Sequence, residues 1–132
     1  MKTAEKLIVQ YHNGIHYVDV PGTPSIDYAA MEPSMYYINL KSVLKPEDAI
    51  AAYELISFFE TAHKLKREFG LIVKQRILTA TFSNVIITGV DSTYEQTQDP
   101  VEVLEIHLYM YFFTNTEPTI CFTDNPAVRG GS

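Results

Sequence analysis

Four histidines are the residues of this sequence whose type most readily binds a metal ion or transfers a proton. They are His12, His16, His63 and His107, and none has the His-x-His or His-Glu-x-x-His spacing that places two imidazoles on one ion. His12 and His16 fall on opposite faces of the hairpin predicted below. We therefore expect no metal site, and we interpret His63 and His107 as surface or interface residues rather than acid–base catalysts.

Neither the acidic segment 91–100 nor the single cysteine suggests catalysis. Asp91, Glu95 and Asp99 lack the regular ligand spacing and the turn glycine of a calcium-binding loop, so we expect a solvated polar loop. Cys121 cannot form an intrachain disulfide, and we expect it to be a small buried hydrophobic residue. Because a phosphate-binding glycine-rich loop and a nucleophile elbow are also missing, the sequence predicts no cofactor and no enzyme activity.

Length and composition predict one ordinary globular domain. The chain has 132 residues, of which 46% are hydrophobic and 20% charged, and we assign residues 1–128 to a single domain and 129–132 to a flexible tail. No signal-peptide pattern or long apolar run is present, so we expect a cytoplasmic or virion protein without membrane contact. A net charge of −6 argues against a general grip on nucleic acid.

Charge is distributed unevenly along the chain. Residues 77–128 contain seven acidic residues and no lysine or arginine. Five of the ten cations lie just upstream, at Lys64, Lys66, Arg67, Lys74 and Arg76. Soluble domains usually mix their charges, so this separation predicts that each block meets a complementary partner. In a self-assembling protein that partner can be another copy of the chain.

The first forty residues predict a hairpin, an excursion and a strand. Residues 7–12 and 15–20 flank Asn13-Gly14, which favours a two-residue type I′ turn that pairs His12 with Ile15. That register places one apolar set on the core face, namely Leu7, Val9, Tyr11, Val18 and Val20. Residues 21–34 contain three prolines and predict a long excursion that reaches a neighbour, before a short strand at 35–40.

A single helix is predicted over residues 46–69. Pro46 suits a first turn, cations near the end suit the helix dipole, and Gly70 supplies a left-handed stop. Apolar residues recur at three- and four-residue spacing, at Ala52, Leu55, Phe59, Ala62, Leu65 and Phe69. The helix is therefore expected to pack on a sheet.

The second half of the chain is predicted to be β-structure. Residues 71–82 and 85–90 form a long, bent strand region separated by Ser83-Asn84, and a short last strand is expected at 120–122. Between them, residues 101–113 alternate strictly, with one apolar core face and an opposite face that carries Glu105, His107, Tyr109, Tyr111 and Phe113. The fold class is therefore α+β, an antiparallel sandwich or barrel-like sheet with one long helix packed on it.

Two segments and the polar loop between them resemble the closing hairpin of tail tube proteins. The segments are TFSNVIITGV at 81–90 and PVEVLEIHL at 100–108. This family includes phage tail tube proteins and the haemolysin-coregulated tube protein of type VI secretion. The chain departs from the family pattern at Val85, which replaces a small residue, and in its longer helix. The resemblance covers residues 77–113 and implies a subunit of hexameric rings that stack into a hollow tube, without cofactor or catalysis.

Charge and strand pattern favour the same assembly. The partners expected are other copies of the chain, sheath or baseplate-type proteins, and DNA only as a passenger that does not adhere. The residues expected at subunit interfaces are the outer face of the last long strand, the five upstream cations, and Asp91, Glu95 and Asp99. The alternatives are a monomeric or dimeric ligand-binding module or small enzyme, with a pocket lined by Tyr36, Tyr53, Tyr109 and Tyr111, and a ring-shaped terminator or connector.

Overall fold

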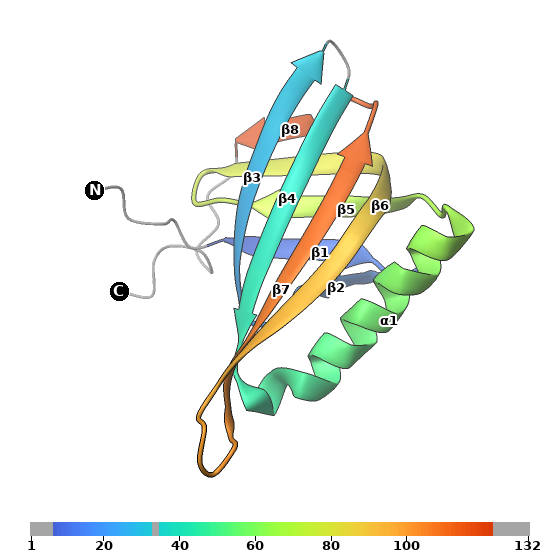
Figure 1. Ribbon diagram of the computed structural model, residues 1–132. Coiled ribbons are helices and arrows are strands. Elements are labelled where there is room, and N and C mark those ends of the chain that lie inside the picture. The colour runs from blue at the N-terminus through green and yellow to red at the C-terminus, as the bar shows by residue number, and fades with distance from the viewer. Residues whose placement is uncertain (1–6, 33–34, 123–132) are drawn as a thin grey trace.

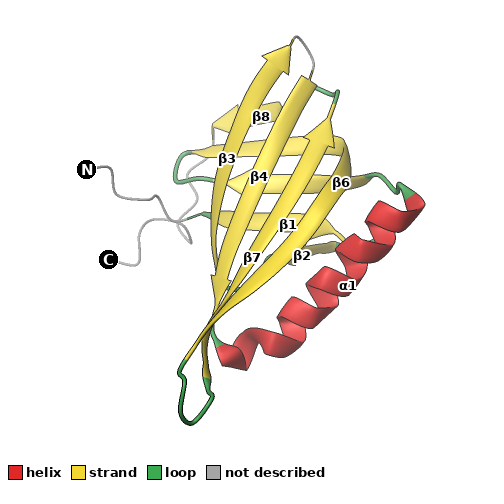
Figure 2. Ribbon diagram, in the orientation of Figure 1, coloured by secondary structure: helices red, strands yellow, loops and turns green. Residues whose placement is uncertain are grey.

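The computed structural model describes residues 7–32 and 35–122 as two antiparallel sheets with one α-helix beside them (Figure 1). Sheet A contains, in order, β2 (Tyr17–Asp19), β1 (Ile8–His12), β5 (Phe69–Lys74), the first part of β6 (Leu78–Gln96) and β8 (Thr119–Phe122). Sheet B contains the second part of β6, β7 (Val103–Thr114), β4 (Met35–Leu44) and β3 (Thr23–Glu32). The predicted α+β class is confirmed, and the sheets do not close into a barrel (Figure 2).

Strand β6 connects the two sheets. Its residues 79–82 and Val85 pair with β5, and its residues 86–96 pair with β7. Between these parts Asn84 has a φ of 56°, and bulges interrupt both ladders. A bulge bends a strand and increases its twist, which lets one strand serve two sheets that cross in Figure 1. The predicted division at Ser83-Asn84 is therefore a bend inside one strand, not a break.

The core lies between the sheets and the helix. The predicted alternation of the last long strand is confirmed at Ile106, Leu108, Met110 and Phe112, which are all buried. An aromatic cluster joins the three parts: the ring centroid of Phe59 on the helix lies 5.0 Å from Tyr11, 5.5 Å from Phe69 and 5.4 Å from Phe112. These rings come from β1, β5 and β7, so Phe59 ties the helix to both sheets.

The helix ends earlier than the sequence predicts. A 3-10 turn (Pro46–Asp48) precedes α1 (Ala49–Leu65), and Lys66 takes the left-handed conformation that was assigned to Gly70. The amides of Lys66 and Arg67 donate to the carbonyls of His63 and Ala62, which closes the last turn. Phe69 and Gly70 belong to β5, and a Cβ at position 70 would collide with the hydroxyl of Tyr17.

The predicted stripe of α1 is confirmed in part. Ala52, Leu55, Phe59 and Ala62 are buried, and Phe69 is buried in β5, but Leu65 is exposed at the end of the helix. Leu65 is the last residue of α1, so helical spacing overestimates the length of the buried stripe by one position. The contacts of α1 with β6 confirm that the helix packs on the sheet.

The N-terminal hairpin has a longer turn than predicted. His12 pairs with Tyr17 rather than Ile15, so the turn contains residues 13–16. Gly14 has a positive φ but Asn13 does not, and the Asn13 side chain instead accepts bonds from the amides of Ile15 and His16 at 2.9 and 3.1 Å. The register differs by two residues, and an even shift keeps every side chain on its face, so the predicted core set remains inward.

Two further segments are more regular than predicted. Residues 23–32 form β3 along the edge of sheet B, where Pro24 is tolerated because an edge strand has unpaired positions. Residues 91–96 continue β6, which leaves a loop of 97–102. Residues 33–34 of the predicted excursion and the predicted tail at 129–132 lie outside the described residues.

Candidate assembly surface

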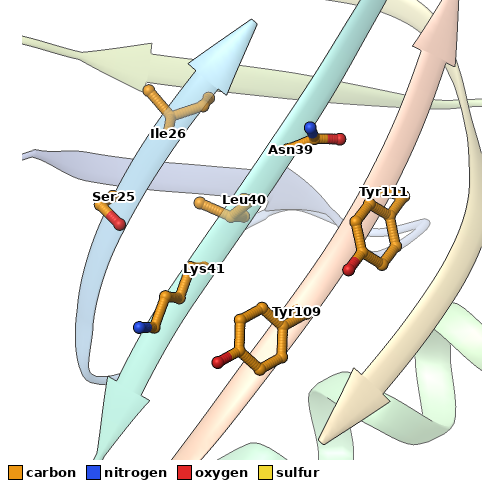
Figure 3. A pocket seen from close by; sticks show the side chains of 7 residues that line it. All are labelled: Ser25, Ile26, Asn39, Leu40, Lys41, Tyr109 and Tyr111. Carbon is orange, nitrogen blue, oxygen red and sulfur yellow. The ribbon is translucent and has the colours of Figure 1, made fainter.

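The outer face of sheet B carries a row of aromatic side chains. Tyr109 and Tyr111 on β7 lie beside Lys41 and Asn39 on β4, with which they pair directly. The Lys41 ammonium lies 5.6 Å from the centre of the Tyr109 ring, within range of a cation–π contact. Figure 3 shows these side chains around a shallow depression of about 170 Å³. The surface is aromatic with few charges, which is typical of a contact surface rather than a reaction centre.

This face is only partly covered within one chain. Tyr111 is 38% exposed and Tyr37 is 41% exposed, while Tyr109 and Phe113 are half-buried by their neighbours. The ring centroids of Tyr37 and Phe113 are 5.1 Å apart, which extends the aromatic row toward the end of β7. The expectation that this face is covered by another subunit therefore stays a prediction.

The hairpin of β6 and β7 extends beyond the rest of the fold (Figure 1). We call residues 93–105 the arm. Exposed apolar side chains occur along it, at Tyr94, Val101 and Leu104. The predicted site residues Glu95 and Glu105 pair directly across its two strands, Asp99 lies in its loop, and Asp91 lies on β6 before it. The acidic residues are thus spread along a strand ladder rather than gathered in the predicted loop.

His107 lies next to two carboxylates at the base of the arm. Its Nε2 is 3.2 Å from Glu105 Oε1 and 3.9 Å from Glu95 Oε2. Spacing along the sequence could not find this group because one member comes from the opposite strand, ten residues before Glu105. Among the described residues, no other set of three such side chains lies close enough to share an ion.

An apolar groove lies between α1 and the base of the arm. Its volume is about 350 Å³, and Tyr53 and Tyr94, which line it, are 74% and 59% exposed. The other lining residues are Pro46, Ala49, Ala52, Ile56, Val103 and Ile106. The groove depends on how the arm passes the start of α1, which no local sequence pattern predicts. The sequence feature that could have indicated the groove is the pair Tyr53 and Tyr94, two large aromatic residues outside the predicted core.

The five upstream cations form two separate groups. Lys64, Lys66 and Arg67 lie at the end of α1, whereas Lys74 and Arg76 follow at the other end of β5. A six-residue strand is about 20 Å long, so the groups lie on different sides of the molecule (Figure 1). None of the five makes an ion pair with another described residue. The five cations are thus one block in the sequence but two groups in space, and their contact with another copy stays a prediction.

The tyrosine-lined pocket of the alternative hypothesis is also divided. Tyr109 and Tyr111 line the depression on sheet B, whereas Tyr53 lines the groove beside α1, and Tyr36 lines neither. The remaining expected positions are unremarkable. His12 packs edge-on against Tyr17, His16 lies in the turn, and His63 is exposed on α1. Cys121, expected to be buried, is exposed on β8 because that strand lies at the edge of sheet A.

No protein-family model matches the sequence, and no curated protein sequence matches it. Among solved structures, the chain is similar to the cap of the anti-feeding prophage, described as the AFP tube terminating cap and determined by cryo-EM. The identity is 14%, the match covers 93% of this chain and 94% of that chain, and the TM-score is 0.49. Separately, no helix in the described part of the chain has the length and apolar character needed to cross a membrane.

Proposed function

We propose that this chain is a non-catalytic structural subunit that assembles with itself into rings, and that the rings stack into a hollow tube of the phage-tail or contractile-injection type. The observation that carries the proposal is the arm. It extends beyond the core with Tyr94, Val101 and Leu104 exposed. Exposed apolar side chains on a strand-built projection favour a partner surface, since they gain free energy when removed from water.

The ends of the molecule favour a head-to-tail contact. The acidic arm begins beside the start of α1, and Lys64, Lys66 and Arg67 lie at the opposite end of the same helix (Figure 1). Opposite charges at opposite ends cannot meet within one copy. A contact between two different surfaces generates rings where the rotation closes and stacks where it does not. We therefore assign the arm and the cations at the end of α1 to contacts between copies.

Open sheet edges support the same proposal. Strands β3 and β8 each have an edge without a strand partner among the described residues, and Phe122 on β8 is 81% exposed. Unpaired edges invite pairing with another chain, and closure of a ring removes them. We infer that neighbouring copies cover these edges.

A hollow tube of this kind would carry a passenger in its channel and contact other proteins on its outside. An acidic, cation-poor surface facing a channel repels phosphate groups, so DNA in the lumen would slide without binding. Sheath or baseplate-type proteins are the further partners that a tube of this kind implies. A terminator or connector would share the ring but not the unlimited stacking.

Negative-stain microscopy of the purified chain tests the proposal. Rings or tubes are expected, and rings that never lengthen would favour a terminator or connector. A chain that stays monomeric at all concentrations would contradict ring assembly. The groove beside α1 favours one other function, the binding of an apolar small molecule, because it is concave and tyrosine-lined. A monomer that binds such a ligand would support that alternative.

A further inference from the structure

We propose that Glu95, Glu105 and His107 form a binding site for one divalent transition-metal ion, with Zn²⁺ as the ion to test. The ligand atoms of the three side chains all lie within 4.8 Å of one another. The site needs only one copy of the chain, so this inference does not rest on the proposed assembly.

The β6–β7 ladder holds the three side chains on one face. Glu95 and Glu105 are direct partners across the two strands, and His107 follows Glu105 by two residues. Side chains two residues apart on a strand point the same way, as do those of directly paired residues. Because paired strands rather than a loop carry all three groups, the backbone fixes their spacing before any ion arrives.

The distances are close to those that a bound ion requires. Zinc bonds of about 2.0–2.2 Å at tetrahedral angles place neighbouring ligand atoms about 3.4 Å apart. His107 Nε2 lies 3.2 Å from Glu105 Oε1 and 3.9 Å from Glu95 Oε2. Both carboxylates are at least partly exposed and can rotate, so a small adjustment of Glu95 completes three ligand positions.

Electrostatics favours a cation at this point. Two carboxylates directly opposite each other on paired strands repel, and among the described residues neither of them makes an ion pair with a lysine or arginine. A proton and a metal ion compete for the same nitrogen of an imidazole. The test must therefore distinguish an imidazole that binds metal from an imidazolium that only forms ion pairs.

The ligand types select the class of ion. Calcium and magnesium prefer sites built from oxygen ligands, whereas an imidazole nitrogen with carboxylates suits zinc and other divalent transition metals. Three protein ligands also leave a coordination position open, as in zinc sites that bind water or another ligand. A bound ion would join β6 to β7 at the base of the arm.

Isothermal titration calorimetry of the tag-free chain with ZnCl₂ tests the site. One ion per chain is expected, and Glu95→Gln, Glu105→Gln and His107→Asn should each weaken binding by about tenfold or more. Glu102→Gln and Asp91→Asn remove the same charge from the same hairpin outside the cluster and should leave the affinity nearly unchanged. Circular dichroism of each variant checks that the fold is retained.

A second measurement identifies the nitrogen. Zinc should shift the imidazole nitrogen resonances of His107 and leave those of His12, His16 and His63 unchanged. The proposal is overturned if no zinc binds, if the three ligand variants bind as the native chain does, or if the shifts appear at the other histidines. It is also overturned if the imidazole nitrogen resonances of His107 shift with pH but not with zinc.

Discussion

Tyr111 is at the centre of the outer face of sheet B, paired with Asn39 on one side and Gly89 on the other. Position 89 carries no side chain, which leaves one side of the ring uncovered within the chain. We predict that Tyr111→Asp weakens self-assembly and lowers the free energy of unfolding by about 1–2 kcal/mol without unfolding the chain, because the ring is 38% exposed and aspartate is disfavoured in a strand. Assembly is measured by sedimentation, and folding by thermal denaturation.

Ile15→Asp is the matched control for that substitution. Ile15 is 83% exposed in the turn between two strands of sheet A, so the same gain of charge should leave assembly unchanged. Equal assembly of the two variants would remove the outer face of sheet B from the proposed interface.

Tyr11 provides a pH test of the core. Its ring is buried between Phe58 and Phe59, and burial, with a smaller contribution from the nearby Glu54 carboxylate, raises the pKa of the Tyr11 hydroxyl above its ordinary value of 10.0. Above this ordinary value the unfolded chain loses the proton while the folded chain keeps it, so stability falls as pH rises.

Tyr11→Phe should remove this part of the alkaline destabilisation. We expect the loss in free energy of unfolding between pH 8 and pH 11, measured with urea, to be smaller in the variant, as the linkage between proton binding and folding requires. The other tyrosines are common to both chains and cancel in the comparison. An identical loss in both chains would contradict the raised pKa.

At the scale of elements, the sequence predicts the position and type of most segments but not their ends. Hydrophobic alternation locates β7 and its buried face, because that pattern depends only on which side of one strand meets the core. The end of α1 depends on Lys66 and on the space that Tyr17 takes beside Gly70, which are tertiary facts. The continuity of β6 depends on partners on two different sheets, which no local pattern records.

Gly22 tests the connection between β2 and β3. It has a φ of 86°, and a Cβ at this position would lie 2.5 Å from the carbonyl oxygen of Val43. We predict that Gly22→Ala lowers the free energy of unfolding by more than the roughly 1–2 kcal/mol expected from left-handed backbone strain alone. Thermal or urea unfolding measures this change.

Gly14→Ala is the control for this substitution. Gly14 also has a positive φ, 103°, but a Cβ there has open space around it, so only the backbone term remains. The difference between the two variants isolates the steric term. Equal losses would show that β4 moves away from position 22 without cost.

At the scale of the whole molecule, the sequence correctly indicates that charges are separated but not how they are placed. The five cations are neighbours in the chain, yet β5 carries Lys74 and Arg76 away from the end of α1. The pairing of Glu95 with Glu105, and hence the group around His107, depends on the register of a hairpin whose first strand continues to Gln96, beyond the predicted end at Val90. Pairing between strands that are distant in the sequence decides both the placement of the cations and the group around His107. The candidate site was therefore less predictable than the core.

The two cation groups provide a charge-reversal test. Lys64→Glu, Lys66→Glu and Arg67→Glu in one chain should weaken assembly, and assembly of the native chain should weaken as salt rises from ~0.05 to ~1 M. Each exposed pair contributes only about 0 to 1 kcal/mol, so the three changes are needed together. Lys74→Glu with Arg76→Glu is the comparison, and an equal effect of both sets would indicate net charge rather than a specific contact.

The mass of the native chain in solution, measured by size-exclusion chromatography with light scattering at low salt, tests the central claim of self-assembly most directly. The account predicts a stable species of several chains, with the hexamer as the expected ring, and larger species as concentration rises. A mass equal to one chain at every concentration would contradict the account.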